Sequence, residues 1–449
     1  GPYAGYLSVI LPVSLYYMLF DYRIVKIKFN LKNIFVYIRW TGSLLAFILI
    51  ILVLPATMSR ASWLAAFLAC LFVLSTYCYN HKKREIDSLY KQHKKSLLPV
   101  IIGILFLLLL SIGGMYYLKK DSADGRSLMW KTSIAAIKNN PTGVGIGCFS
   151  KYYGEAQANY FQSGNASEQE ELVAGSPEYA FNEYLQIGLE LGVNPLLIFI
   201  SLIVYTFYIG YKRGNYAPMG GLIALLVFAF MSYPFNLLSF LIILVFLLVL
   251  TNNKQEEVKA NFKSITLNIS FILCTLAIVG LSVYKRYPMH EAYQEWTKVK
   301  MLNNVGIDEK QAITYERLSP WLHQESKFLF EYAQCLNRLE RYEESNSILE
   351  KMANISCDPM IYNVMGRNYQ AMKEYREAEK AFKRASLLIP SRLYPYYLLT
   401  KLYDEIGDKQ RVLSTARIVL TKEAKVHTEA INEMREEVNK ICDKYKSEQ

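Results

Sequence analysis

Long uninterrupted apolar blocks constrain the possible folds of this chain more than any other feature of its sequence. Segments such as "LLAFILIILVL" and "LLSFLIILVFLLVL" contain no charged residue. Blocks of this kind are typical of membrane spans, and a bilayer requires the backbone to satisfy its hydrogen bonds internally, so we expect helices. One block could be a buried helix of a soluble protein, but eight blocks with basic connectors argue against that. The predicted spans lie near residues 4–20, 34–54, 62–80, 98–118, 184–209, 217–232, 236–251 and 265–284.

Basic residues gather in alternate connectors and indicate orientation. Connectors 21–33 and 81–97 are rich in Lys and Arg, whereas connector 55–61 carries only Arg60. The positive-inside rule places the basic connectors in the cytoplasm, so we expect loop 119–181 and the segment after 285 to lie outside. The formal net charge of +11 is then mainly a topology signal. We expect membrane lipids as partners and no nucleic acid.

The chain starts with Gly, and its opening "GPYAGYLSVILP" enters a span from the outer side. We therefore expect further spans to precede it. The seven cysteines are scattered singly, with no CxxC pair and no His/Cys cluster. This pattern predicts neither a zinc site nor a disulfide framework.

From about residue 287 the sequence becomes charged, helical and self-similar. The segment "YNVMGRNYQAMKEYREAEKAFKRASLLIP" has the consensus spacing of a tetratricopeptide repeat, and weaker copies lie one period upstream and downstream. The matching positions are Gly366, Tyr369, Ala378, Phe382, Ala385 and Pro390, with Ala333, Leu336, Ser345, Leu349 and Met352 before them and Tyr403, Val412 and Ala416 after them. The predicted fold is therefore all-α, with a polytopic helical membrane bundle at 1–286 and a tetratricopeptide α-solenoid at 287–449. The solenoid would dock a protein partner or serve as a self-packing appendage.

The loop 119–181 is too long for a simple connector. "SLMWKTSIAAIKNN" has helical spacing and Pro141 closes it. Glycine then occupies every second position, at Gly143, Gly145 and Gly147. Such glycines either present backbone N–H groups to a phosphate or form a flexible turn.

Two arginines, Arg60 and Arg126, lie on the predicted outer side. Each could snorkel to lipid phosphate, or both could converge on one diphosphate, which suits a guanidinium fork. In "SPEYAFNEYLQIGLELG", Asn182, Gln186 and Glu190 fall four residues apart and are expected on one helix face. This polar stripe would line a cavity at the outer membrane edge or join helices within the bundle.

The segments "TMSRASWLA", "GR…W…NNPTGVGIGCF" and "FNEYLQIGLELG" together resemble the signature segments of the O-antigen ligase and polymerase superfamily. These bacterial inner-membrane enzymes transfer glycans from a polyprenyl-diphosphate carrier. The resemblance covers about residues 1–250. The opening "GPYAGYL" also resembles an outer-face segment of members from Bacteroidetes-like bacteria, some of which carry tetratricopeptide tails.

The resemblance implies a multi-pass protein with a periplasmic active-site loop and repeat domain, and no metal or cofactor. Arg60 and Arg126 match arginines thought to hold the carrier's diphosphate. Asn182 and Gly192 fit the ligase pattern, but Phe181 stands where that pattern has its His, the proposed general base. Phe181 could instead be a platform for a sugar ring or the prenyl chain, or a simple anchor at the membrane interface. Glu178 is our preferred replacement base and Glu183 the alternative.

The predicted function is periplasmic-face transfer of a glycan from an undecaprenyl-diphosphate carrier. The acceptor would be the lipid A core, a second glycan or a protein side chain. A non-catalytic membrane scaffold that recruits partners through the repeats is the alternative, which Phe181 favours. A transporter ranks last, because few charges besides Glu190 lie in the predicted spans.

Overall fold

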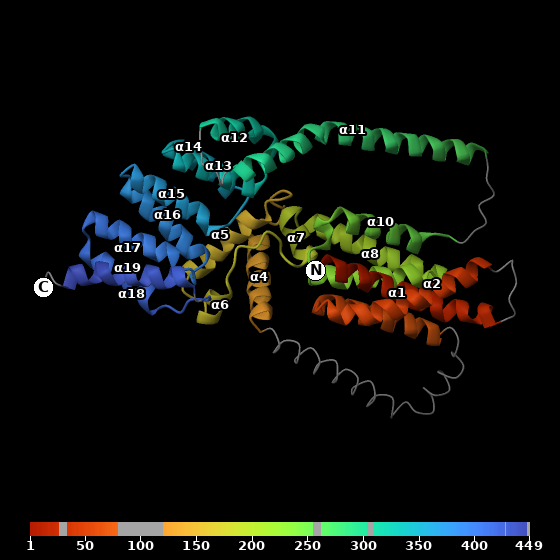
Figure 1. The fold of residues 1–449 in the computed structure, drawn as a ribbon. Helices are drawn as coiled ribbons and strands as arrows, with labels where there is room; N and C mark the ends of the chain where they lie inside the picture. Colours follow the sequence, from red (N-terminus) through yellow and green to blue (C-terminus); the bar gives the residue numbers. More distant parts are fainter. Residues whose placement is uncertain (27–33, 80–119, 255–261, 303–308, 427, 447–449) are drawn as a thin grey trace, which may run out of the picture. The chain divides into compact units, whose positions relative to one another are not determined.

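The computed structural model describes residues 1–26, 34–79, 120–254, 262–302, 309–426 and 428–446. The regular elements in these ranges are all helices, so the prediction of an all-α chain is confirmed (Figure 1). The chain forms two compact units. Unit 1 contains Gly1–Trp130, Ile137–Gly143 and Tyr179–Glu256, and unit 2 contains Lys131–Ala136, Val144–Glu178 and Glu257–Gln449.

Apolar helices dominate unit 1. They are α1 (Pro2–Lys26), α2 (Ile34–Ala56), the helix Arg60–Tyr79, α8 (Val193–Arg213), α9 (Tyr216–Phe230) and α10 (Leu238–Asn252). Five helices of the described chain are long and apolar enough to cross a membrane: Pro2–Tyr22, Ile34–Ala56, Arg60–Tyr79, Val193–Arg213 and Ile269–Met301. Helices α9 and α10 are shorter. The predicted span 98–118 lies outside the described residues.

Small residues allow the apolar helices of unit 1 to pack closely. Ala61, Ala65 and Ala69 lie one turn apart on the helix Arg60–Tyr79 and join a cluster with Phe228 of α9 and Phe240 of α10. Alanine at this spacing lets helix backbones approach, which supplies the packing that holds membrane helices together. Many apolar side chains on α2, α8 and α10 stay exposed, as expected for surfaces that face lipid.

The predicted span 184–209 is wrong as a single helix. Helix α7 (Glu183–Glu190) ends before α8 begins at Val193. Gly192 has φ +101°, and a Cβ there would lie 2.6 Å from the Thr142 carbonyl carbon. The Val193 N–H donates to the Pro141 carbonyl at 2.9 Å. The chain at 141–143 therefore crosses the helix break, and Glu190 ends α7 instead of lying well inside a span.

Unit 2 is built from paired helices. Its elements are α5 (Phe149–Gln162), α6 (Glu168–Val173), α11 (Phe262–Leu302), α12 (Glu309–Leu322), α13 (Ser326–Arg338), α14 (Tyr342–Ala353), α15 (Pro359–Ala371), α16 (Tyr375–Leu388), α17 (Tyr394–Ile406), α18 (Lys409–Thr421) and α19 (Glu429–Lys446). Helices α13 to α18 form three successive hairpins that stack on one another (Figure 1). The expected boundary at 286/287 falls inside α11, and α4 (Lys120–Asn139) contributes residues to both units.

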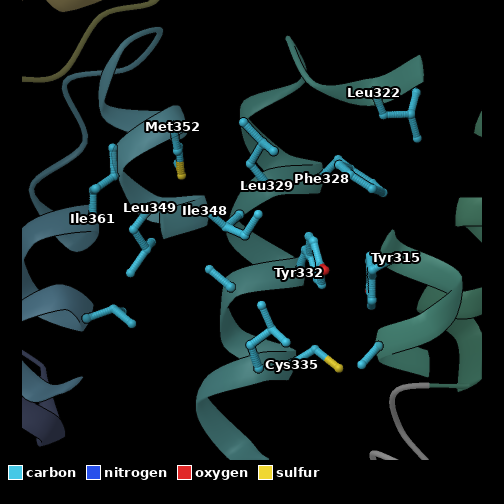
Figure 2. Close-up of a cluster of buried hydrophobic side chains, with 14 of the residues drawn as sticks. Tyr315, Leu322, Phe328, Leu329, Tyr332, Cys335, Ile348, Leu349, Met352 and Ile361 are labelled. Atoms are coloured by element: carbon cyan, nitrogen blue, oxygen red, sulfur yellow. The ribbon is translucent and has the colours of Figure 1, made fainter. Parts of the chain in front are cut away.

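The hairpins share an apolar core. Figure 2 shows Phe328, Tyr332 and Leu349 among the side chains that fill the space between α12, α13 and α14. Gly366 of α15 lies directly against the ring of Phe382 in α16, where a Cβ would overlap the ring. A glycine is required there because the two helices of the hairpin meet at that point.

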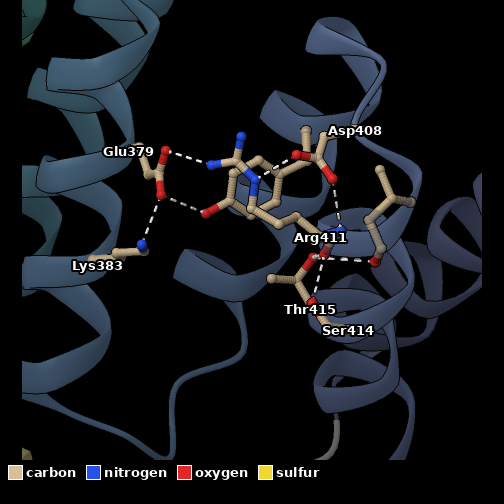
Figure 3. Close-up of polar contacts among 8 residues, drawn as sticks. Glu379, Lys383, Asp408, Arg411, Ser414 and Thr415 are labelled. Atoms are coloured by element: carbon tan, nitrogen blue, oxygen red, sulfur yellow. Dashed lines mark hydrogen bonds and ion pairs between the residues drawn. The ribbon is translucent and has the colours of Figure 1, made fainter.

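Charged side chains link neighbouring helices at the surface. Arg411 of α18 donates to Glu379 of α16 at 2.9 Å and to Asp408 at 2.7 Å, and Lys383 also donates to Glu379 (Figure 3). Exposed pairs of this kind contribute little stability. Their effect is to favour one alignment of the hairpins.

The loop helices pack on the hairpins within unit 2. The Gln157 amide of α5 donates to the Leu388 carbonyl at 2.6 Å, and Lys422 pairs with Glu171 of α6 at 2.6 Å. The Ser150 hydroxyl accepts from the Cys357 N–H at 3.2 Å. These contacts require loop residues 149–173 and the tail to lie on the same side of a membrane.

Candidate functional site

Arg60 follows a tight turn between two apolar helices. Met58 adopts φ +50°, the Thr57 hydroxyl donates to the Leu54 carbonyl at 2.6 Å, and Trp63 Nε1–H donates to the same carbonyl at 2.9 Å. These bonds fix the turn and set Arg60 at the first residue of its helix. The unpaired N–H groups at a helix start favour an anion, and the Arg60 side chain adds a full positive charge there.

Arg126 lies near Arg60 in the first half of α4. Burial and the nearby Arg60 charge both lower the pKa of the Arg126 guanidinium. Within the described residues we find no hydrogen bond or ion pair of the Arg126 side chain. Two cations at close range are unfavourable unless an anion joins them. The electrostatics beside Arg126 therefore favour an anion.

Trp130 adds a donor one turn after Arg126. Its indole Nε1–H is buried and has no hydrogen-bond acceptor among the described groups, and its ring packs edge-on against Phe230 at 5.1 Å. Residues four apart share a helix face, so the indole N–H and the guanidinium lie on the same face of α4. A buried N–H without an acceptor is costly, and a bound anion would satisfy it.

Asn182 and Gln186 organise the start of α7. The Asn182 side chain caps the helix by accepting from the N–H groups of Tyr184 and Leu185. The Gln186 side chain accepts from the Ala180 N–H at 3.0 Å and donates to Glu190 at 3.1 Å. The second bond places Gln186 and Glu190 on one face, as the spacing predicted. Both amides thus hold the shape of the segment.

Glu183 is the buried acid of this segment. Its side chain is only 3% exposed, and Oε1 accepts from the Phe235 N–H at 2.6 Å. Burial raises the pKa of Glu183 to about 7, and the Glu190 charge adds to this rise although the Phe235 N–H opposes it. A carboxyl group with a pKa near neutrality can take up and release a proton at cellular pH.

Phe181 belongs to an aromatic cluster beside Glu183. Its ring meets Tyr233 edge-on at 5.0 Å, and Tyr233 stacks on Tyr179 at 5.2 Å. Phe181 has φ +48°, a conformation that bulky residues rarely adopt and that surrounding contacts must hold in place. The three rings are only partly buried, so they offer an apolar surface at the start of α7.

The remaining predicted site residues lie in different surroundings. Gly143 belongs to unit 1 and has φ +91°, and a Cβ there would lie 2.5 Å from the Leu191 carbonyl carbon. Gly145 and Gly147 belong to unit 2 and also have positive φ, but a Cβ on Gly147 would meet no atom within 4 Å. Glu178 is exposed and belongs to unit 2. Close chain crossing thus accounts for Gly143.

The polar groups described for unit 1 lie within one stretch of sequence, from Arg60 to Glu190. Residues 45–200 match the O-antigen ligase family. The O-antigen ligase match covers Arg60, Arg126, Trp130 and the whole of α7, and it supports glycan transfer by a multi-pass membrane protein as the general activity. A comparison with curated proteins finds no match.

The sequence analysis did not single out Trp130, and it placed Glu183 second to Glu178. Trp130 was visible in "GRSLMW" four residues after Arg126, which is the spacing of a shared helix face. No sequence signal distinguished Glu183 from Glu178, because burial depends on α7 packing beside Phe235.

Proposed function

We propose that the protein transfers a glycan from a polyprenyl-diphosphate carrier to an acceptor at the periplasmic face of a bacterial inner membrane. The observation that carries this proposal is the approach of Arg60 to a half-buried Arg126 that lacks a carboxylate partner in the described chain. The helix start at Arg60 and the Trp130 N–H add to the same preference for an anion. The O-antigen ligase match supports a lipid-linked glycan donor, and we take the anion to be the diphosphate of its carrier.

In the proposed reaction the acceptor hydroxyl attacks the anomeric carbon of the donor sugar. The bond between that carbon and the diphosphate oxygen breaks, and its electron pair leaves with the diphosphate. Arg60 and Arg126 stabilise the charge that grows on this leaving group. The proton of the acceptor hydroxyl passes to a carboxylate.

We propose Glu183 as this carboxylate, in place of Glu178. Glu183 is buried and has a raised pKa, whereas Glu178 is exposed. No hydrogen-bond donor to Glu183 Oε2 is found in the described part of the chain, so this oxygen is available for the acceptor. The Phe235 N–H fixes Oε1 and therefore the direction of the carboxylate. The aromatic cluster of Tyr179, Phe181 and Tyr233 would hold a sugar ring or the prenyl chain.

The tail hairpins fit the proposed tetratricopeptide repeats. Buried side chains occupy the repeat positions Ala333, Leu336, Leu349, Phe382 and Ala416. The acceptor remains one of the lipid A core, a glycan or a protein. A non-catalytic scaffold is the second candidate, because Phe181 replaces the His of the ligase pattern.

Gene deletion with glycan profiling tests the proposal. Loss of the protein should leave a carrier-linked glycan in the membrane and remove the matching glycan from lipopolysaccharide, capsule or periplasmic proteins. Wild-type protein should restore the profile and the Arg126→Lys variant should not. An unchanged profile in the deletion strain would leave the scaffold as the better explanation.

A further inference from the structure

Three adjoining cavities form a groove on unit 2. The first, of about 470 Å³, lies between α15, α17 and α19. The second, of about 430 Å³, shares Tyr394 and Met434 with the first, and the third, of about 630 Å³, shares Ser391 with the second. The three cavities neighbour one another through these shared wall residues, and we call them together the hairpin groove. Each cavity has the size of an ordinary ligand site.

The groove is polar at both ends and has no net charge. Its first cavity carries two basic and two acidic side chains, its second two basic ones, and its third one basic and three acidic ones, which gives five of each sign. Lys401 pairs with Glu437 at 2.9 Å in the first cavity, and Lys422 pairs with Glu171 in the third. The second cavity has an excess of two positive charges and the third an excess of two negative ones, so only the groove as a whole favours neither a polyanion nor a polycation.

Three tyrosines follow one another around the start of α17. Tyr394 and Tyr397 stack with ring centres 6.1 Å apart and line the first cavity, while Tyr396 lines the third. Tyrosine combines an apolar ring with a hydroxyl and loses little conformational entropy when it binds. The middle cavity adds apolar side chains such as Leu393 and Ile431.

We propose that the hairpin groove binds the acceptor glycan of the transfer reaction. A sugar hydroxyl donates to a carboxylate and accepts from an ammonium at once, so paired Lys and Glu side chains satisfy both of its roles. The C–H face of a sugar ring covers a tyrosine or the apolar side chains of the middle cavity. An uncharged chain with hydroxyl edges and apolar faces therefore matches the groove along its length.

Residues of the loop form part of the groove wall. Ala174 and Gly175 line the second cavity, and the same stretch of chain continues into the aromatic cluster and α7. The assignment of the glycan as acceptor rests on the proposed function. The groove itself, and its preference for a glycan, stand on unit 2 alone.

An extended peptide is the competing occupant of a groove between helices. Peptides that dock in this way rely on apolar anchors at regular spacing. The first cavity instead presents Arg367 and Glu433, two exposed side chains for which the described chain shows no ion-pair partner. Opposite charges that remain open at the rim favour hydroxyl groups over apolar anchors.

Photocrosslinking in the full-length protein tests the proposal. A benzophenone amino acid replaces Arg367 in the groove or, as a matched control, Arg376 on the outer surface of α16. After ultraviolet irradiation, adducts that stain for carbohydrate should form with the benzophenone at position 367 and not at position 376. Periodate oxidation should degrade these adducts. Protein adducts, no adducts, or equal adducts at Arg376 would overturn the proposal.

A second measurement separates acceptor binding in the groove from the catalytic step. The Arg367→Ala/Glu433→Ala double variant should raise KM for the acceptor roughly tenfold and leave kcat unchanged, whereas Arg376→Ala/Glu350→Ala should change neither. Unchanged KM in the groove variant would contradict the inference. If the deletion strain keeps an unchanged glycan profile while the glycan adduct at position 367 persists, the proposed function fails and the assignment of the groove to a glycan stands.

Discussion

The guanidinium of Arg126 lies half-buried beside a second positive charge, and this environment decides between two roles. A snorkelling arginine needs only a route to the interface, which lysine also provides. A diphosphate clamp needs the planar fork, which lysine lacks. The same substitution therefore separates the roles.

We expect Arg60→Lys and Arg126→Lys each to lower the transfer rate roughly a hundred- to thousand-fold, or about 2.7–4 kcal/mol of transition-state stabilisation. Transfer is measured with a purified lipid-linked donor, and protein level and membrane insertion serve as checks. Arg376→Lys, at an exposed position of α16, should leave the rate unchanged. Full activity in both site variants would contradict the clamp.

Glu183 gives a pH-dependent prediction. A general base acts in its ionised form, so the wild-type rate should rise as pH increases through about 7, the raised pKa of Glu183. Glu183→Gln should abolish this rise and lower the rate, whereas Glu178→Gln should preserve both the rate and the profile. An unchanged profile in Glu183→Gln would assign the proton to another group.

Stability should change in the opposite direction from activity. Because the folded pKa of Glu183 is raised, protonation stabilises the folded state, and this contribution is lost as pH increases from about 4.5 to about 7. Above that window the ionised carboxylate is buried at a cost that glutamine avoids. We expect the melting temperature of Glu183→Gln to equal or exceed that of the wild type at pH 8.

At the scale of elements, the crossing of residues 141–143 over the α7–α8 break depends on two glycines. Gly143→Ala or Gly192→Ala should cost about 1–2 kcal/mol for the positive φ, with steric overlap against the other segment in addition. Gly214 also has a positive φ, but its nearest neighbour would lie at 3.8 Å. Gly214→Ala should therefore lower the melting temperature less than Gly143→Ala or Gly192→Ala. Equal losses in all three variants would show that the two segments do not pack tightly at the crossing.

The docking of α5 on the hairpins is a second prediction at this scale. A Cβ at Gly154 would overlap Cys357, so Gly154→Leu should separate the two surfaces. Cys357 is buried, and burial raises the pKa of its thiol to about 11. In a background without the other cysteines, maleimide labelling of Cys357 should increase in Gly154→Leu and stay low in Asn159→Leu, which changes an exposed position of the same helix.

Local patterns predicted most helices of this chain. The apolar blocks became α1, α2, α8, α9 and α10, and the loop helix that Pro141 closes became the end of α4. The break at Gly192 was missed, because it depends on a chain crossing from residues 141–143. Convergence of Arg60 and Arg126 was one of two alternatives that the sequence left open, whereas the burial of Glu183 needed tertiary packing that no short motif encodes.

For the whole molecule, residues 144–178 of the loop and the tail belong to one compact unit in the described chain. A 287–449 fragment lacks α5 and exposes the surface around Cys357 and Leu388. A synthetic peptide of residues 144–178 should therefore bind this fragment and raise its melting temperature in circular dichroism. A peptide with Gln157→Ala and Gly154→Leu should not, and equal stabilisation by both peptides would contradict specific docking.

The contacts between α5, α6 and the hairpins also set an order of events during synthesis. Ser150 bonds to Cys357, which is made 207 residues later. Gln157 bonds to the Leu388 carbonyl, 231 residues later, and Glu171 to Lys422, 251 residues later. Pairings this distant form late, since the intervening chain has to be made and closed into a loop first. The ribosome therefore has to make the chain as far as Lys422 before α5 and α6 have all of these partners, so a protein shortened within the hairpins also loses structure in the loop.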